Sequence, residues 1–464
     1  MTAKWSAFLV VSIGTLLGTI DHSGINVALP TFARIFEALP ETVLWVMLAH
    51  GLVYTGFTLT AGRLADMFGR RRVYTLGLVV LTVGLTLSSL AQGLWQLVAY
   101  RAIQGFGAAL LVSNSSAIVA AAFPGEERGK GLGLLEAVVG VGLMTGPVVA
   151  GVLLDWLDWR AIFYVRIPVA LGAIVLAVRL LIEPGGAGGQ RRFDRPGAAT
   201  LFAGLTCLIV AINQGPRAGW GSAWIVVLLA AAAVFLALFV AVEARDSEPV
   251  MDLGLFKRRA FSTYMAVLLA YFVPIGAVLF LLPFHLTHGL GYTASAVGLF
   301  LTVWPLLLLL VSPVSGTLSD RIGSRTMVTV GMGAALAVLL LLSRLPTDGA
   351  AILTVTAMAL LGVAAGLLLT PSYSAIMGAT PAGRLGTAAA LIATVRNVGL
   401  ALGQASAATV YAVRRAAHEV SLPAALESLD RGRLALTLGF QDAVLAAAAV
   451  ALVGVLIILA FGRQ

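Results

Sequence analysis

Charged residues are scarce in this chain, and so is cysteine. Only 11% of its 464 residues are Asp, Glu, Lys or Arg, whereas 59% are hydrophobic. About a quarter of the residues of a soluble globular domain are charged, so this composition excludes a soluble protein. The single cysteine, Cys207, lies inside an apolar run, which excludes a disulfide framework and a cysteine metal site.

Histidine is also rare. The five histidines show no metal-ligand spacing, and no segment between the apolar runs resembles a phosphate-binding loop, a nucleophile elbow or a catalytic dyad. We therefore expect no enzyme activity, no cofactor and no metal. The formal net charge is +9, but the basic residues stand singly or in short clusters in turns between apolar runs. Such residues orient a protein in a bilayer, so we expect no nucleic-acid partner.

Long apolar runs, in contrast, fill most of the chain. A helix that crosses a bilayer needs about 20 apolar residues, and the sequence predicts an all-α integral membrane protein with fourteen such helices. The first run is too long for a signal peptide and leads into further spans, so we expect it to be retained. The predicted spans are 7–29, 43–62, 73–91, 95–121, 131–154, 161–181, 197–213, 222–243, 261–284, 295–318, 326–343, 351–376, 389–412 and 441–461.

The basic residues predict the orientation of these spans. With the amino terminus in the cytoplasm, most Lys and Arg residues fall on the cytoplasmic side, as the positive-inside rule requires. Both termini are then cytoplasmic, and we expect a multi-pass protein of a bacterial inner (plasma) membrane. The longest outer segment, 414–441, has mixed charge, and we expect it to hold a short amphipathic helix without chemistry.

One ten-residue pattern, Gly-x-Leu-x-Asp-x-x-Gly-x-Arg, occurs twice, at Gly62–Arg71 and at Gly316–Arg325. A membrane protein that repeats one turn in both halves is typically built from two related helical bundles. We expect a six-helix bundle at 1–183, a two-helix insertion with cytoplasmic linkers at 184–260, and a second six-helix bundle at 261–464.

The repeated turn is predicted to close the cytoplasmic side. Its glycines allow a tight turn, and its aspartate can cap a helix or pair with a basic group. A plain positive-inside turn is the alternative, although a charge bias alone requires neither the glycine spacing nor the aspartate. The predicted gate consists of Gly62, Asp66, Gly69, Arg70, Arg71, Asp320 and Arg321.

Four ionisable residues are clear cases inside predicted spans, where a charge costs about 2.5–3.5 kcal/mol. Counted from the span ends, Asp21 and Arg101 lie at one depth, about 21 Å from the inner edge of a core about 30 Å thick. Glu136 and Arg396 lie at another, about 8–10 Å from the inner edge. We therefore predict two acid–base couples. Asp21 is the expected proton carrier. Glu136 and Arg396 are expected to form an ion lock between bundles that breaks when Glu136 is protonated, and structural roles are the alternatives for both couples.

Small residues mark a further span. Gly142 and Gly146 are spaced so that another helix can approach closely, and Pro147 permits a bend. The alternatives are a flexing bundle interface or tight packing alone. The glycine spacing also matches a dinucleotide-binding pattern, but no strand precedes it and the segment is apolar.

These segments together resemble a known family. The repeated turn resembles motif A of the major facilitator superfamily, although Met67 stands where that motif usually has a basic residue. Thr19–Pro30, Arg101–Ala109 and Gly140–Gly151 are similar to the first-span motif, motif B and the antiporter motif C of its fourteen-span drug/proton antiporters. The resemblance implies alternating access between two bundles.

We therefore expect a proton-coupled efflux antiporter, acting as a monomer on hydrophobic or amphipathic compounds. A lipid exporter of the same fold, an importer and a non-transporting membrane sensor are the alternatives. Several aromatic residues in spans could line an apolar cavity or simply pack: Trp45, Tyr54, Tyr271, Phe272 and Trp304.

Overall fold

The computed structural model describes residues 3–124, 127–181, 195–245, 253–345, 351–381, 385–423 and 428–462. Within these ranges the regular structure is helical, and no strand is present. The chain divides into two compact units, Met1–Leu205 and Thr206–Gln464, with the division inside helix α9. The three predicted domains, 1–183, 184–260 and 261–464, stay a prediction.

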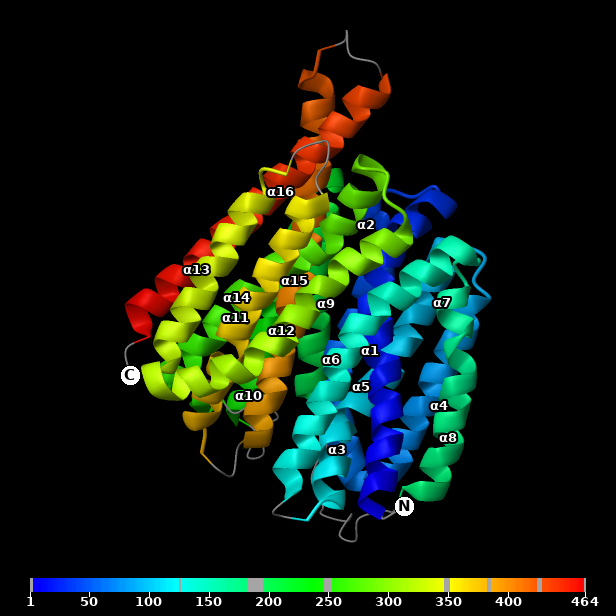
Figure 1. Ribbon diagram of the computed structural model, residues 1–464, viewed down its shortest axis with the longest axis vertical. Helices are drawn as coiled ribbons and strands as arrows, with labels where there is room; N and C mark the ends of the chain where they lie inside the picture. Colours follow the sequence, from blue (N-terminus) through cyan, green and yellow to red (C-terminus); the bar gives the residue numbers. More distant parts are fainter. Residues whose placement is uncertain are drawn as a thin grey trace. The chain divides into compact units, whose positions relative to one another are not determined.

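Unit 1 contains helices α1 to α8 and the start of α9 (Figure 1). Its helices are α1 (Ala3–Ile35), α2 (Pro40–Val43), α3 (Trp45–Phe68), α4 (Arg70–Ser89), α5 (Leu94–Ala122), α6 (Arg128–Trp156), α7 (Ala161–Tyr164), α8 (Arg166–Leu180) and α9 (Arg195–Ala218). Helix α1 packs against α5, α6 and α8, and α5 also packs against α3 and α4.

Unit 2 contains the rest of α9 and the helices that follow it. These are α10 (Ala223–Arg245), a 3₁₀ turn (Leu253–Lys257), α11 (Arg259–Phe284), a π-helical turn (His285–Gly289), α12 (Ala294–Ile322), α13 (Ser324–Leu342), α14 (Ala351–Gly378), α15 (Leu385–Ser421) and α16 (Ser428–Phe461). Helix α11 packs against α14, α15 and α16, and α14 also packs against α12 and α13.

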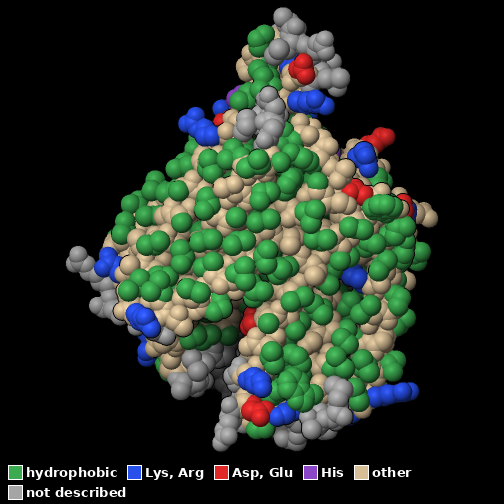
Figure 2. All heavy atoms as spheres, viewed as in Figure 1, with side chains coloured by type: hydrophobic (Ala, Val, Ile, Leu, Met, Phe, Trp, Pro, Cys, Tyr) green, Lys and Arg blue, Asp and Glu red, His purple; other side chains and the backbone are tan. Residues whose placement is uncertain are grey.

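The helix lengths suit a bilayer. Eleven helical segments of the described chain are long and apolar enough to cross a membrane, and each of the fourteen predicted spans overlaps at least one helix. Three of these helices, α3, α9 and α15, are not among the eleven, so the exact number of spans stays a prediction. On the face that Figure 2 shows, apolar side chains cover the middle of the helices and most basic side chains lie near helix ends.

Two local features depart from or refine the prediction. The predicted outer segment 414–441 is mostly a continuation of α15 and α16, since α15 ends at Ser421 and α16 begins at Ser428. Charged residues end a span but need not end a helix, because the backbone hydrogen bonds continue outside the bilayer.

In the repeated turns, Gly69 and Gly323 have φ values of 97° and 86°, which explains the need for glycine at both positions.

Candidate functional site

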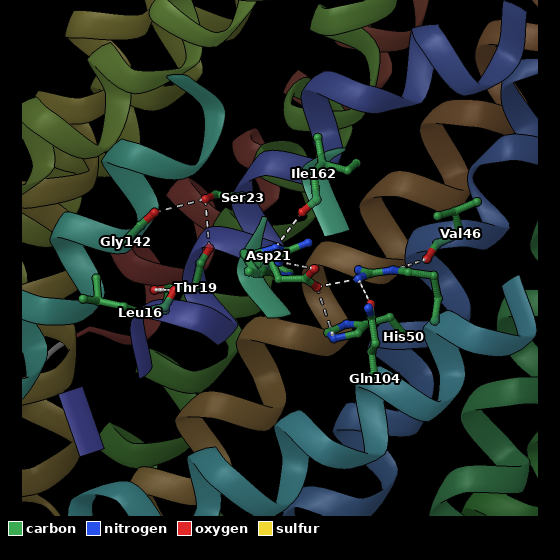
Figure 3. Close-up of polar contacts among 12 residues, drawn as sticks. Leu16, Thr19, Asp21, Ser23, Val46, His50, Gln104, Gly142 and Ile162 are labelled. Carbon is green, nitrogen blue, oxygen red and sulfur yellow. Dashed lines mark hydrogen bonds and ion pairs between the residues drawn. The ribbon is translucent and has the colours of Figure 1, made fainter. Parts of the chain in front are cut away.

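A buried carboxylate lies at the centre of unit 1. Asp21 stands in the middle of α1 with its side chain fully buried (Figure 3). An isolated charge at such a position would be very costly. The carboxylate is therefore expected to have opposite charges as neighbours, and the structure supplies two.

Two arginines hold this carboxylate, one on each oxygen. Arg101 of α5 donates from Nη1 to Asp21 Oδ2 at 2.5 Å, and Arg166 at the start of α8 donates from Nη1 to Oδ1 at 2.5 Å. The side chain of Arg101 is 1% exposed and that of Arg166 is 12% exposed. Asp21 thus ties α1 to both α5 and α8.

Each arginine is itself held in place. Arg101 donates from Nε to the carbonyl of Val46 at 3.3 Å and from Nη1 to the side-chain oxygen of Gln104. Arg166 donates from Nε to the carbonyl of Ile162 at 2.7 Å. Figure 3 shows Val46, Gln104 and Ile162 surrounding the carboxylate. These contacts orient both guanidinium groups towards Asp21.

A histidine completes the cluster. His50 of α3 lies with Nε2 3.8 Å from Asp21 Oδ2, and its ring stacks on that of Tyr54. We call Asp21, His50, Arg101 and Arg166 the charged cluster. With His50 neutral it carries one negative and two positive charges, so the carboxylate is more than balanced by cations.

The structure therefore confirms one predicted couple and enlarges it. Asp21 and Arg101 meet, as their matched depths predict. The sequence prediction missed Arg166, because a residue five positions into a span can also extend to the bilayer surface. It treated His50 as isolated, because depth along the chain does not say which way a side chain points. The signal that could have found Arg166 is its position inside the predicted span 161–181.

The small residues predicted to allow close approach do so against α1. A Cβ added at Gly142 would lie 1.8 Å from the Thr19 hydroxyl, and one at Gly146 would lie 2.0 Å from the Ser23 hydroxyl. The Ser23 hydroxyl donates to the carbonyl of Gly142 at 3.3 Å. Helix α6, which contains Pro147, thus packs directly beside the turn of α1 that carries Asp21.

The predicted gate is only partly described. The side chains of Asp66 and Asp320 lie outside the described residues. Arg70 donates to the carbonyl of Ala117 at 3.3 Å, and Arg71 donates to the carbonyl of Val178. Gly62 is half-buried and Arg321 is exposed. The arginines therefore tie α4 to α5 and α8 within unit 1, and the latch role of the gate stays a prediction.

The second predicted couple joins different units. Glu136 lies exposed on α6, and Arg396 is half-buried in α15. Each unit is described by itself, so their pairing stays a prediction.

A second unit 1 contact ties the beginnings of α1 and α6. Lys4 donates to Glu127 at 2.5 Å, and this hydrogen bond lowers the pKa of the Glu127 carboxyl below its ordinary value of 4.5.

Unit 2 has a different polar content. The Tyr271 hydroxyl of α11 and the indole N–H of Trp304 in α12 are buried without a hydrogen-bond partner of good geometry in the described part of the chain. The two side chains interact with each other. Across the described residues, no group of His, Cys, Asp or Glu has the arrangement of a metal site.

Comparisons with known proteins agree with this architecture. A family model described as Major Facilitator Superfamily matches residues 11–404. The chain is 32% identical over 412 residues to the riboflavin transporter RibZ of Clostridioides difficile. This match covers 89% of this chain and 89% of RibZ. It is 34% identical over 406 residues to the multidrug resistance protein Stp of Mycobacterium tuberculosis, covering 87% of this chain and 75% of that protein.

Among solved structures, a bacterial homologue of the human lysosomal transporter Spinster, in an inward-facing and unoccupied conformation, matches with a TM-score of 0.72. The match covers 98% of this chain and 96% of that one, at 14% sequence identity. At that identity the likeness concerns the fold.

Proposed function

The chain belongs to the Major Facilitator Superfamily, and we propose that this multi-pass membrane transporter is a proton-coupled efflux antiporter. Membership of that family makes it a transporter rather than an enzyme. The observation that carries the proposal is the charged cluster, because a buried carboxylate held by two arginines is the kind of group whose protonation changes helix contacts. The termini are proposed to lie in the cytoplasm of a bacterial cell.

Proton binding to Asp21 removes the charge that holds Arg101 and Arg166. Two buried guanidinium groups would then be left without a counter-ion, which is strongly unfavourable. The cluster must relax by moving α5 or α8 away from α1, or by admitting water. Protonation is thereby coupled to helix movement, which is what a proton-driven transporter requires.

Helix α6 is placed to transmit that movement. It packs on α1 through Gly142 and Gly146, within two residues of Asp21 along α1. A shift of α1 or α6 therefore changes the surroundings of Asp21. We propose that the repeated turns, with Asp66 and Asp320, latch the cytoplasmic side closed in one state and release it in the other.

The proposed cargo is an amphipathic organic molecule. RibZ is named for riboflavin and Stp for multidrug resistance, so cargoes with aromatic rings and polar groups are the first to test. Tyr271 and Trp304, which place polar groups in the interior of unit 2, suit such a molecule. Two arginines against one aspartate in the charged cluster disfavour a cation as cargo there, which leaves neutral drugs or lipids as the candidates.

The test is transport in liposomes with an imposed pH gradient. Riboflavin, drugs and fluorescent lipids are offered in both directions to wild type, Asp21→Asn and Asp158→Asn. Asp158 is a matched control, because it is an exposed aspartate of unit 1 paired with Arg160. We expect gradient-driven transport to fail in Asp21→Asn and to survive in Asp158→Asn. Gradient-driven transport by Asp21→Asn at the wild-type rate would refute proton coupling at this residue, and uptake in place of export would refute efflux.

A further inference from the structure

A groove of about 810 Å³ opens on the surface of unit 1, along the first turns of α4. Its lining comes from α4, the last turn of α8 and the end of α3, and α4 and α8 pack against each other. The groove is far along the chain from the charged cluster and shares no residue with it. Its volume is in the range of sites that hold small ligands.

The basic side chains of the groove gather at one end. Arg71 and Arg72 lie there with Met67, Phe68 and Gly69 of the α3–α4 turn, and Val178 of α8 faces Arg71. Thr75, Leu76 and Val79 line the part further along α4. Arg72 and Val79 are seven residues apart on one face of α4, which corresponds to about 10 Å along the helix axis. The part of the groove at Val79 therefore reaches about 10 Å further along the membrane-spanning helix than the basic end.

The apolar lining is open rather than packed. Leu76 is 52% exposed, Val79 is 39% exposed and Val178 is 50% exposed. In a membrane these side chains face lipid rather than water. A ligand that fills this part of the groove must therefore be apolar there, and it must reach the groove from within the bilayer.

The basic end is positively charged and partly fixed. No acidic residue is among the described side chains that line the groove. Arg71 donates one hydrogen bond to the carbonyl of Val178, which holds its guanidinium group at the rim between α4 and α8. Arg72 beside it is exposed. A planar guanidinium group binds phosphate oxygens with two parallel hydrogen bonds.

We propose that this groove is a binding site for one anionic phospholipid. Its phosphate lies against Arg71 and Arg72, and the first part of an acyl chain lies along Leu76, Val79 and Val178. Phospholipids combine a negative headgroup with an apolar tail in the order and at the spacing that the groove requires. The inference is independent of which cargo is transported and of whether Asp21 carries protons.

Native mass spectrometry of the purified protein tests the site. The full chain in mild detergent is mixed with equal amounts of phosphatidylglycerol and phosphatidylcholine that carry the same acyl chains. We expect wild type to retain phosphatidylglycerol about tenfold over phosphatidylcholine, and the double variant Arg71→Gln/Arg72→Gln to lose that preference. Equal retention of both lipids by wild type would contradict the proposal.

The repeated turn supplies a matched control. Arg325 occupies the place of Arg71 in the second copy, and it donates to the carbonyl of Leu459 at 2.8 Å as Arg71 donates to that of Val178. The double variant Arg321→Gln/Arg325→Gln removes the same charge, and we expect it to keep the preference. Loss of the preference in this control as well would show that net charge, not the groove, selects the lipid.

Two further arms separate the remaining explanations. Arg71→Lys/Arg72→Lys keeps the charge but not the paired hydrogen bonds, so it should retain a reduced preference for phosphatidylglycerol, whereas a full wild-type preference would contradict the role of the guanidinium groups. Glycerol phosphate has the same anionic group without acyl chains. If it displaces phosphatidylglycerol at equal concentration, the groove binds free phosphate compounds and the lipid assignment is wrong.

Discussion

The two units share a packing frame. In unit 1 a Cβ on Gly146 would meet the carbonyl of Ile20 at 2.8 Å, and in unit 2 a Cβ on Gly403 would meet the carbonyl of Val273 at 1.9 Å. Helix α6 thus approaches α1 closely in unit 1, and α15 approaches α11 in unit 2. Helices α5 and α3 of unit 1 and α14 and α12 of unit 2 repeat the same relation, since Gly105 abuts the backbone of His50 and Gly362 that of Trp304.

The side chains at matching positions of the two packing frames differ in charge. Asp21, which follows Ile20, corresponds to Pro274, which follows Val273. Arg101, four residues before Gly105, corresponds to Met358, four residues before Gly362. Because the same frame forms in unit 2 with apolar residues at these places, the frame does not require the charges of unit 1. This is the strongest reason to assign the charged cluster a function instead of a structural role.

The largest effect should come from giving unit 1 the chemistry of unit 2. The triple variant Asp21→Leu/Arg101→Met/Arg166→Met replaces the charges by apolar side chains, so it should fold at least as stably as wild type while transport falls by more than about 100-fold. Asp21→Leu alone leaves two buried cations and should be less stable than the triple variant by about 3–5 kcal/mol. Thermal unfolding and liposome transport measure both quantities. Wild-type transport by the triple variant would make the difference between units functionally irrelevant.

The sequence predicts the helices and their pairing better than it predicts the side-chain contacts of the charged cluster. Every apolar run that predicts a span overlaps a helix of the described chain, because a span must be about 20 residues long, and the repeated turn predicts the related helix pairings. Depth along the helices also pairs Asp21 with Arg101. Depth contains no information about direction around a helix axis, however, so it could not place His50 or Arg166 beside Asp21. Contacts that depend on tertiary packing had to come from the structure.

The shared frame should be sensitive in both units. Gly146→Ala and Gly403→Ala should each destabilise the protein by about 1–3 kcal/mol, since overpacking forces the backbone to shift. Gly403→Ala should cost more, because its nearest obstacle is a backbone carbonyl and that of Gly146 is the mobile Ser23 hydroxyl. Gly18→Ala and Gly333→Ala are controls with open space around the new methyl group. Thermal unfolding that ranks the controls as equally damaging would contradict the packing argument.

Glu136 of unit 1 and Arg396 of unit 2 are predicted to form a couple, and such a couple should show energetic coupling. If Glu136 and Arg396 form the predicted lock, Glu136→Gln and Arg396→Gln each impair transport, and the double variant is less harmful than the sum of the two. The expected coupling is about 1 kcal/mol, within the range for directly interacting residues. A double-mutant cycle on initial transport rates measures it. Additive effects would remove the lock from the mechanism.

The smallest effect concerns the Lys4–Glu127 contact of unit 1. Because Lys4 lowers the pKa of Glu127, the contact stabilises the folded state above pH 4.5, and this stabilisation is lost as the pH falls below that value. Lys4→Gln should therefore lower the unfolding temperature slightly at pH 7 and by less at pH 3. Thermal unfolding at the two pH values checks this. An equal decrease at both would show that Lys4 acts through packing.

Cargo-induced proton release tests the central claim, that the charged cluster of unit 1 couples protons to cargo, most directly. The purified protein is mixed with a transported compound in weakly buffered solution, and the pH change is followed with an indicator dye. Antiport through Asp21 predicts about one proton released per protein in wild type and in Asp158→Asn, and none in Asp21→Asn. Wild-type release by Asp21→Asn would contradict the account.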